Sequence, residues 1–295
     1  MTRPWGPPRI DALPGGRLHL QHGPIDLIVE ISAADRDEVQ RARRQAMGHF
    51  ADILATLVTE LPLLRAPLGP RPPRLDGPVA QRMAAACWPH REVFITPMAA
   101  VAGAVADDVL AALVRGRRLD RAYVNNGGDI ALHLGPGAIY RVGLADDRNG
   151  ALGGFIDVRS ADPVRGIATS GWRGRSLSLG IADAVTVLAA DAAAADAAAT
   201  LVANAVNVDH PAVRRAPACD VRDDTDLGDL PVTIAVESLP RAAVQAALRN
   251  GRAVAQRMRR DGLIHGACLR LQGISELIVD TPAGSDGIHE ETARA

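Results

Sequence analysis

The stretch AYVNNGGDIALHL, residues 122–134, constrains the fold most, because it interrupts a strand-like run with two amides, two glycines and a carboxylate. Apolar alternation resumes directly afterwards, and further β-like runs follow with Gly, Asp or Asn between them. Hairpins and helices alternate here, whereas a doubly wound sheet would show regular βαβ spacing. The sequence therefore predicts an α+β fold of mainly antiparallel strands with packed helices. The strands are expected at residues 119–125, 130–134, 139–145, 154–158 and 166–170.

The flanking sequence supplies further hairpins and the helices. Residues 16–32 alternate about a His-Gly-Pro turn, and an apolar stripe at spacings of 3 and 4 predicts a helix after Ser32, which resembles a capping-box residue. Pro- and Gly-rich residues 1–16 predict an irregular arm, residues 17–280 one domain, and the polar residues 281–295 a disordered tail. VFITPMAAVAGAVADDV and AVTVLAADAAAADAAATLV share one pattern, a strand followed by an Ala-rich helix containing Asp. Two related halves and two chance Ala-rich helices both explain it.

Composition excludes several classes of function. All 33 basic residues are Arg, so a Schiff-base Lys and a P-loop Lys are both excluded. The net charge of −1 and the aromatic content of 3% argue against binding to nucleic acid or to an anionic membrane. The three cysteines show no metal-ligand spacing and fit a reducing compartment. The N-terminus lacks an apolar signal region, and two aspartates interrupt the most apolar window, so a cytoplasmic protein is expected.

The NNGGDI stretch has two interpretations. Gly127 and Gly128 can adopt positive φ and admit a ligand close to the backbone, while consecutive N–H groups can bind an anion. The side chains of Asn125 and Asn126 could recognise a planar heterocycle. The alternative is a hairpin or bulge in which these residues only satisfy turn geometry.

The helix after Thr186 offers a candidate metal site. Asp191 is its predicted N-cap, and Asp196, Thr200 and Asn204 recur every four residues, which places them on one helix face. Two oxygen ligands one turn apart suit a hard cation such as Mg²⁺, which completes its shell with water, carbonyls or phosphate. The alternative is a polar stripe that faces water.

The stretch ATSGWRGRS ends a predicted strand at Thr169, Ser170 and Gly171. Its hydroxyls, N–H groups and the guanidinium groups of Arg173 and Arg175 could bind phosphate. An ordinary surface turn explains the same residues, because Ser-Gly pairs are common at turns.

Taken together, four stretches resemble the ApbE-like superfamily, whose best-known members are FAD:protein FMN transferases, and more closely its UPF0280 branch. They are TPMAAVAGAVADDV, NNGGDI, TSG and ADAVTVLAADAAAADAAAT, in the family's order. The resemblance implies a domain that binds FAD or a related nucleotide as its small-molecule partner. It also implies a Mg²⁺ site at Asp196 and Thr200 beside the pyrophosphate. The matching residues are Asn125, Gly127, Gly128, Asp129, Ser170, Gly171, Thr186, Asp196 and Thr200.

Two differences from the transferase pattern leave the activity open. Ala102 stands where the transferases carry a Lys before Gly103, and their His-x-x-Asp-Pro-x-x-Gly hairpin has no counterpart. One expectation is a Mg²⁺-dependent transferase in which Arg173 and Arg175 hold phosphate and Asp129 or Asp183 serves as the base. The other is a binding or accessory protein for a flavin- or pterin-like cofactor. Both are compatible with a homo-oligomer.

Overall fold

The computed structural model describes residues 5–145, 152–279 and 288–289. The chain divides into two compact units. Unit 1 comprises Met1–Gly135, Arg165–Ala168 and Ala189–Ala197; unit 2 comprises Pro136–Val164, Thr169–Leu188 and Ala198–Ala295. The boundaries fall within strands β8 (Gly166–Ser170) and β9 (Ala184–Ala189) and within helix α5 (Ala192–Ala205).

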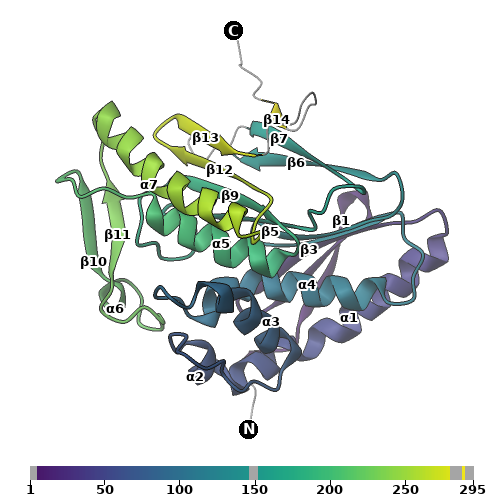
Figure 1. Cartoon of the computed structure of the whole chain (residues 1–295). Helices are drawn as coiled ribbons and strands as arrows, with labels where there is room; N and C mark the ends of the chain where they lie inside the picture. Colours follow the sequence, from purple (N-terminus) through teal and green to yellow (C-terminus); the bar gives the residue numbers. More distant parts are fainter. Residues whose placement is uncertain (1–4, 146–151, 280–287, 290–295) are drawn as a thin grey trace. The chain divides into compact units, whose positions relative to one another are not determined.

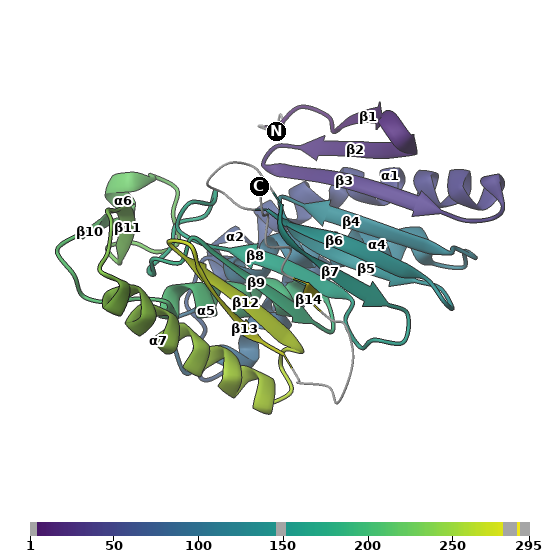
Figure 2. The same ribbon diagram turned by 90° about the horizontal axis from the view of Figure 1, so that it is seen from above.

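Unit 1 contains neighbouring antiparallel strands with helices along them (Figure 2). The strands pair in the order β1-β2-β3-β4-β5, and β5 continues to the first residues of β8 through Ile130↔Ile167. Helices α1 and α4 contact each other and these strands. The elements are β1 (Arg9–Leu13), η1 (Pro14–Gly16), β2 (Arg17–His22), β3 (Ile25–Ser32), α1 (Arg36–Thr59), α2 (Leu61–Leu64), α3 (Pro78–Cys87), η2 (Trp88–His90), η3 (Pro97–Ala100), α4 (Val101–Val114), β4 (Arg121–Asn126) and β5 (Asp129–Leu134).

Unit 2 contains three groups of antiparallel strands and a long amphipathic helix (Figure 1). Strand β12 pairs with β9 and β13, and α7 contacts β12 and β13. The remaining pairs are β6–β7, β7–β14 and β10–β11. The elements are β6 (Ile139–Ala145), β7 (Leu152–Arg159), β10 (Val213–Pro217), α6 (Ala218–Val221), β11 (Pro231–Val236), α7 (Arg241–Arg260), β12 (Gly266–Leu271), β13 (Ile274–Ile278) and β14 (Ile288–His289).

The helices form for local reasons. Asp35 caps α1 by accepting a hydrogen bond from the Asp37 N–H at 2.8 Å, so the cap is Asp35 and not Ser32 as predicted. The apolar side of α7 is buried at spacings of 3 and 4, from Val244 to Met258. In contrast, α4 is buried on nearly every side. Pro97–Val114 is long and apolar enough to span a membrane, yet 67% of this stretch is buried inside the fold, as in a core helix of a globular protein.

The predicted α+β class with mainly antiparallel strands is confirmed, while several local predictions are wrong. Residues 9–13 form strand β1, which pairs with β2 in antiparallel orientation. Backbone hydrogen bonding at the edge of a sheet does not require buried side chains, and most side chains of β1 are exposed. The expected strand VFIT is a turn in which Val93 and Phe94 are exposed. Residues 208–230 are acidic and have no regular apolar pattern, but they contain β10 and α6. Of the predicted disordered tail, residues 281–287 and 290–295 lie outside the described residues, and β14 pairs with β7.

Candidate functional site

The NNGGD segment is a two-residue hairpin turn between β4 and β5. Asn126 pairs with Asp129, and Gly127 and Gly128 have φ angles of 66° and 114°. Positive φ at both central residues is the requirement of the tight turns that match strand twist, which glycine meets without a Cβ clash. The Asn125 Oδ1 accepts a hydrogen bond from the Gly128 N–H at 2.8 Å. Turn geometry therefore accounts for Asn125 and both glycines.

The two other polar residues of this hairpin are buried and lie at the start of α4. Asn126 donates from Nδ2 to the Ala102 carbonyl at 3.1 Å, and only 6% of Asn126 is exposed. Asp129 lies close enough to Asp196 for its charge to raise the pKa of the Asp196 carboxyl. The turn thus brings one amide and one carboxylate to the N-terminus of α4.

Asp196, from the first half of α5, lies at the same place. Burial, followed by the charge of Asp129, raises the pKa of the Asp196 carboxyl well above its ordinary value. The carboxyl accepts a hydrogen bond from the Gly103 N–H at 3.0 Å, and the Ala102 N–H also bonds to it. Because Ala100, the N-cap of α4, provides no side-chain cap, Asp196 caps this helix from a distant segment.

Asp107 performs the converse task for α5. From the middle of α4, its two carboxylate oxygens accept hydrogen bonds from the N–H groups of Ala192 at 3.1 Å and Ala193 at 2.9 Å. Burial, followed by the charge of Asp191, raises the pKa of Asp107 to about 7. Asp191 accepts a hydrogen bond from the Ala194 N–H at 2.8 Å, which confirms it as the predicted N-cap. We call this exchange between α4 and α5 the reciprocal cap.

The reciprocal cap depends on direct contact between backbones. A Cβ at Gly103 would overlap the Ala192 carbonyl and lie 2.7 Å from the Ala193 nitrogen. On another side, a Cβ at Gly166 of β8 would overlap the Asp191 carbonyl. The first residues of α5 are therefore held between two glycines, a reason for these glycines that the sequence did not reveal.

The donor set around Asp196 fits a hard cation. The Asp196 carboxyl would be one oxygen ligand, the carboxyl of Asp129 lies nearby, and Thr200 follows one helical turn after Asp196. Within the described residues, no group of three or more His, Cys, Asp or Glu side chains could bind a metal ion. A protein-only cage is thus absent there, whereas Mg²⁺ usually retains several waters and substrate phosphates. The third residue of the predicted stripe, Asn204, is a structural residue whose Oδ1 accepts a hydrogen bond from the Leu179 N–H at 2.9 Å.

The remaining candidates form a second cluster, in unit 2. The hydroxyls of Thr169 and Thr186 lie 2.9 Å apart, and Ser170 follows on the same strand. Gly171 is packed tightly, since a Cβ there would overlap the carbonyl of Asp183. These residues from β8, β9 and the loop between them therefore lie near one another within unit 2.

Two of the charged candidates in unit 2 bind each other. Arg173 donates from Nε to Asp183 Oδ1 at 2.9 Å and stacks on the Trp172 ring, whereas the other Asp183 oxygen accepts the Gln272 N–H at 2.6 Å. Asp183 therefore has both oxygens occupied, and a role as base would require these bonds to break. Arg175 is exposed, and its carbonyl accepts a hydrogen bond from Arg222.

Sequence reasoning missed two residues beside Asp196. No role in the site was predicted for Asp107 from the sequence, and its contact with α5 joins segments 85 residues apart. Cys87 is completely buried on α3, and its burial together with the charge of Asp196 raises the pKa of its thiol. The regular apolar pattern of α3 gave no sign of this neighbour.

Comparison with known proteins identifies the relatives of this chain. The family model described as AbpE bacteria matches residues 10–277. A UPF0280 protein of Methanococcoides burtonii is 32% identical over 207 residues, which cover 65% of this chain and 78% of the relative. A UPF0280 protein of Methanopyrus kandleri is also 32% identical, over 68% of this chain and 79% of the relative. The apo structure of the Pseudomonas stutzeri flavinyl transferase ApbE covers 92% of this chain and 95% of its own, with 13% identity and a TM-score of 0.44.

Proposed function

Because the chain belongs to the AbpE bacteria family, whose model matches residues 10–277, we propose that it binds FAD or a related pyrophosphate-bearing nucleotide together with Mg²⁺. The observation that carries the proposal is the pair of carboxyl groups, Asp129 and Asp196, at the N-terminus of α4. Neither residue is needed by the hairpin turn itself, whose geometry Asn125 and the glycines satisfy.

The carboxyl pair supports a cation for an electrostatic reason. Two carboxylates that share a poorly hydrated space repel each other, so one of them takes up a proton or a cation enters between them. Burial and the charge of Asp129 raise the pKa of Asp196, so the protonated form of the Asp196 carboxyl is favoured. Mg²⁺ bound at Asp196, with Thr200 as a further oxygen ligand, would reduce the repulsion from Asp129 and would stabilise the negative charge of a diphosphate.

The remaining predicted residues are assigned nucleotide-binding roles within each unit by itself. In our proposal Asn125, Asn126, Gly127 and Gly128 line the ring system, and Thr169, Ser170, Gly171 and Thr186 donate hydrogen bonds to the diphosphate. Arg173 and Arg175 are the cationic groups near that second cluster. The hydroxyl pair of Thr169 and Thr186 supports this assignment, because each hydroxyl can turn its proton toward an acceptor.

If the protein is a transferase, FAD is cleaved at its diphosphate. An acceptor oxygen would bond to the phosphorus of the FMN half, the bond from that phosphorus to the bridging oxygen would break, and AMP would leave. Asp129 is the candidate that would take the acceptor proton, because Asp183 already accepts two hydrogen bonds. Binding without turnover is the second candidate function. It is favoured by Ala102, which stands at the family's Lys position and bonds through its backbone to Asp196 and Asn126.

Substitution of Asp196 tests the metal assignment. Asp196→Asn retains an oxygen that can accept the Gly103 N–H but loses the charge, whereas Asp196→Ala loses both. We expect both variants to lower FAD affinity in the presence of Mg²⁺ by at least about tenfold, because a charged ligand is lost in each. Isothermal titration calorimetry with and without Mg²⁺ measures the effect. A loss confined to the Ala variant would identify Asp196 as a helix cap only.

Chromatography of the same mixtures separates the two candidate functions. AMP released from FAD in the presence of Mg²⁺ and a hydroxyl-bearing acceptor supports transfer. FAD binding without AMP release supports the binding protein.

Asp191→Ala is the matched control for the Asp196 variants, because Asp191 is the N-cap carboxylate of α5 and has a capping role without a proposed metal contact. Unchanged FAD affinity in Asp196→Asn would contradict the metal site.

A further inference from the structure

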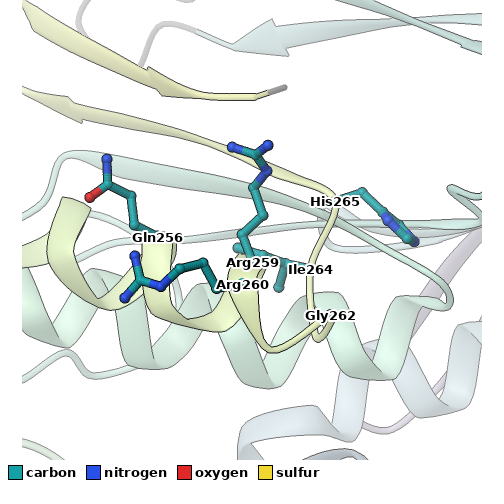
Figure 3. Close-up of a pocket in the computed structure, with 6 residues that line it drawn as sticks. All are labelled: Gln256, Arg259, Arg260, Gly262, Ile264 and His265. Atoms are coloured by element: carbon teal, nitrogen blue, oxygen red, sulfur yellow. The ribbon is translucent and has the colours of Figure 1, made fainter. Parts of the chain in front are cut away.

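A second candidate binding site lies in unit 2, at the C-terminal end of α7. A pocket of about 560 Å³ is lined by Gln256, Arg259, Arg260, Gly262, Ile264 and His265 (Figure 3). This volume lies within the usual range for small-molecule sites, which is roughly 300–1,000 Å³. None of these residues belongs to the site proposed above, and the pocket is formed entirely within unit 2.

The local sequence explains why these side chains surround one space. Gln256, Arg259 and Arg260 are spaced i, i+3 and i+4, so they share a face of α7. The helix ends in a Schellman motif: the Leu263 N–H donates to the Met258 carbonyl, the Gly262 N–H donates to the Arg259 carbonyl, and Gly262 has a φ of 74°. This turn brings Ile264 and His265 back beside the helix end, and a Cβ at Gly262 would meet nothing within 4 Å.

The lining is cationic. Among the residues that the structure describes, it contains two arginines, which stay charged at every physiological pH, and no carboxylate. Asp261, the C-cap residue of α7, is exposed and is not a lining residue. Arginines in a last helical turn also offset the helix dipole, but that role needs no pocket. Arg257, in the same turn, is exposed and lies outside the pocket lining, so it provides a direct comparison.

His265 gives an independent indication of a missing partner. Its Nε2 is buried and has no hydrogen-bond partner within the described part of the chain. A buried polar atom without a partner is unfavourable, and a ligand oxygen would satisfy it once the ring rotates toward the pocket. In Figure 3, Arg259 extends from the end of α7, and His265 extends from the segment beyond the turn in a different direction.

We propose that this pocket binds the phosphate group of a small organic phosphate. The Arg259 guanidinium already donates from Nη1 to the Val279 carbonyl at 3.1 Å, which leaves its other N–H groups. Together with Arg260, the Gln256 amide and His265, these provide more donors than the two oxygens of a carboxylate can use, whereas a phosphate offers three oxygens. The pocket volume leaves room for the organic part of the ligand. The assignment is independent of the flavin proposal, because it rests on other residues.

Titration calorimetry with phenyl phosphate tests the proposal. The full-length chain is used in EDTA at constant ionic strength, so that a Mg²⁺-dependent site does not contribute. We expect binding that Arg260→Gln weakens by about tenfold or more, because a charge-assisted hydrogen bond is lost. His265→Asn, which removes the Nε2 donor, should also weaken it. Arg260 is exposed, so its substitution should leave the melting temperature unchanged.

Arg257→Gln is the matched control, since it removes the same charge from the same helical turn outside the pocket. We expect its affinity for phenyl phosphate to remain within about twofold of the wild type. Equal weakening by both Gln variants would show general electrostatic attraction only and would overturn the proposal. Equal affinity for benzoate would overturn the phosphate assignment, and no binding by the wild type would overturn the site itself.

Discussion

Gly103→Ala is expected to destabilise the protein by about 3 kcal/mol or more, because the added methyl group would meet backbone atoms and not a flexible side chain. The clash involves the Ala192 carbonyl and Ala193 nitrogen, so α4 and α5 would have to move apart. Such a movement would also lengthen the hydrogen bonds of the reciprocal cap. Thermal unfolding followed by circular dichroism should show a melting temperature lowered by roughly 10 °C.

Gly48→Ala provides the control for this substitution. Gly48 also lies within a helix, α1, but a Cβ there would meet nothing within 4 Å. Replacement of an uncrowded helical glycine by alanine should stabilise the protein by up to about 1 kcal/mol. Opposite signs for the two substitutions would support the close approach of α4 and α5. Similar, small effects from both would contradict it.

The second large effect concerns pH. The pKa of Asp107 is about 7 in the folded protein, against an ordinary value of 3.8 for the unfolded chain. Between these values the folded state binds more protons than the unfolded state, so the free energy of unfolding falls as the pH rises. A separation of about three pKa units corresponds to about 4 kcal/mol, fully present below pH 3.8 and lost by pH 7. Asp196, whose pKa is also raised, acts in the same direction.

Urea unfolding at a series of pH values measures how the free energy of unfolding depends on pH. The Asp107→Asn variant isolates the contribution of Asp107 to this dependence. An amide does not titrate, so the variant should show a clearly flatter dependence between pH 4 and pH 7. The part that remains is assigned to other groups, including Asp196. Identical slopes for the variant and the wild type would show that Asp107 does not carry the effect.

The sequence predicted features that depend on neighbouring residues. The β4–β5 turn and the Asp191 cap each require only a few residues in a row, and both are confirmed. Strand β1 was missed because its first four residues are all exposed, so no alternation marks it. The VFIT segment has strand-forming residues, but Val93 and Phe94 are exposed in a turn. Propensity predicted a strand there, and the tertiary structure overrode it.

The candidate site was predictable only in part for the same reason. The spacing of Asp196 and Thr200 indicated one helix face, but it could not show that the Asp196 carboxyl bonds to α4. The contact between Asp107 and Ala192 likewise depends on how distant segments pack, and helical periodicity contains no information about such pairs. At Gly103 and Gly166 the sequence showed only that the residue is small. It did not show which neighbouring backbone requires a glycine there.

The reciprocal cap also has a consequence for synthesis of the chain on the ribosome. The carboxyl group that caps α4 is located 93 residues after the N–H group it binds, and unit 1 is completed only by Ala189–Ala197. A nascent chain that ends near Gly135 therefore has the sequence of α4 but not its cap. Since the exit tunnel delays the appearance of each residue, α4 acquires its cap only after Asp196 has emerged. A premature stop between Val114 and Asp196 would leave a fragment with an uncapped apolar helix, which is a substrate for chaperones and proteases.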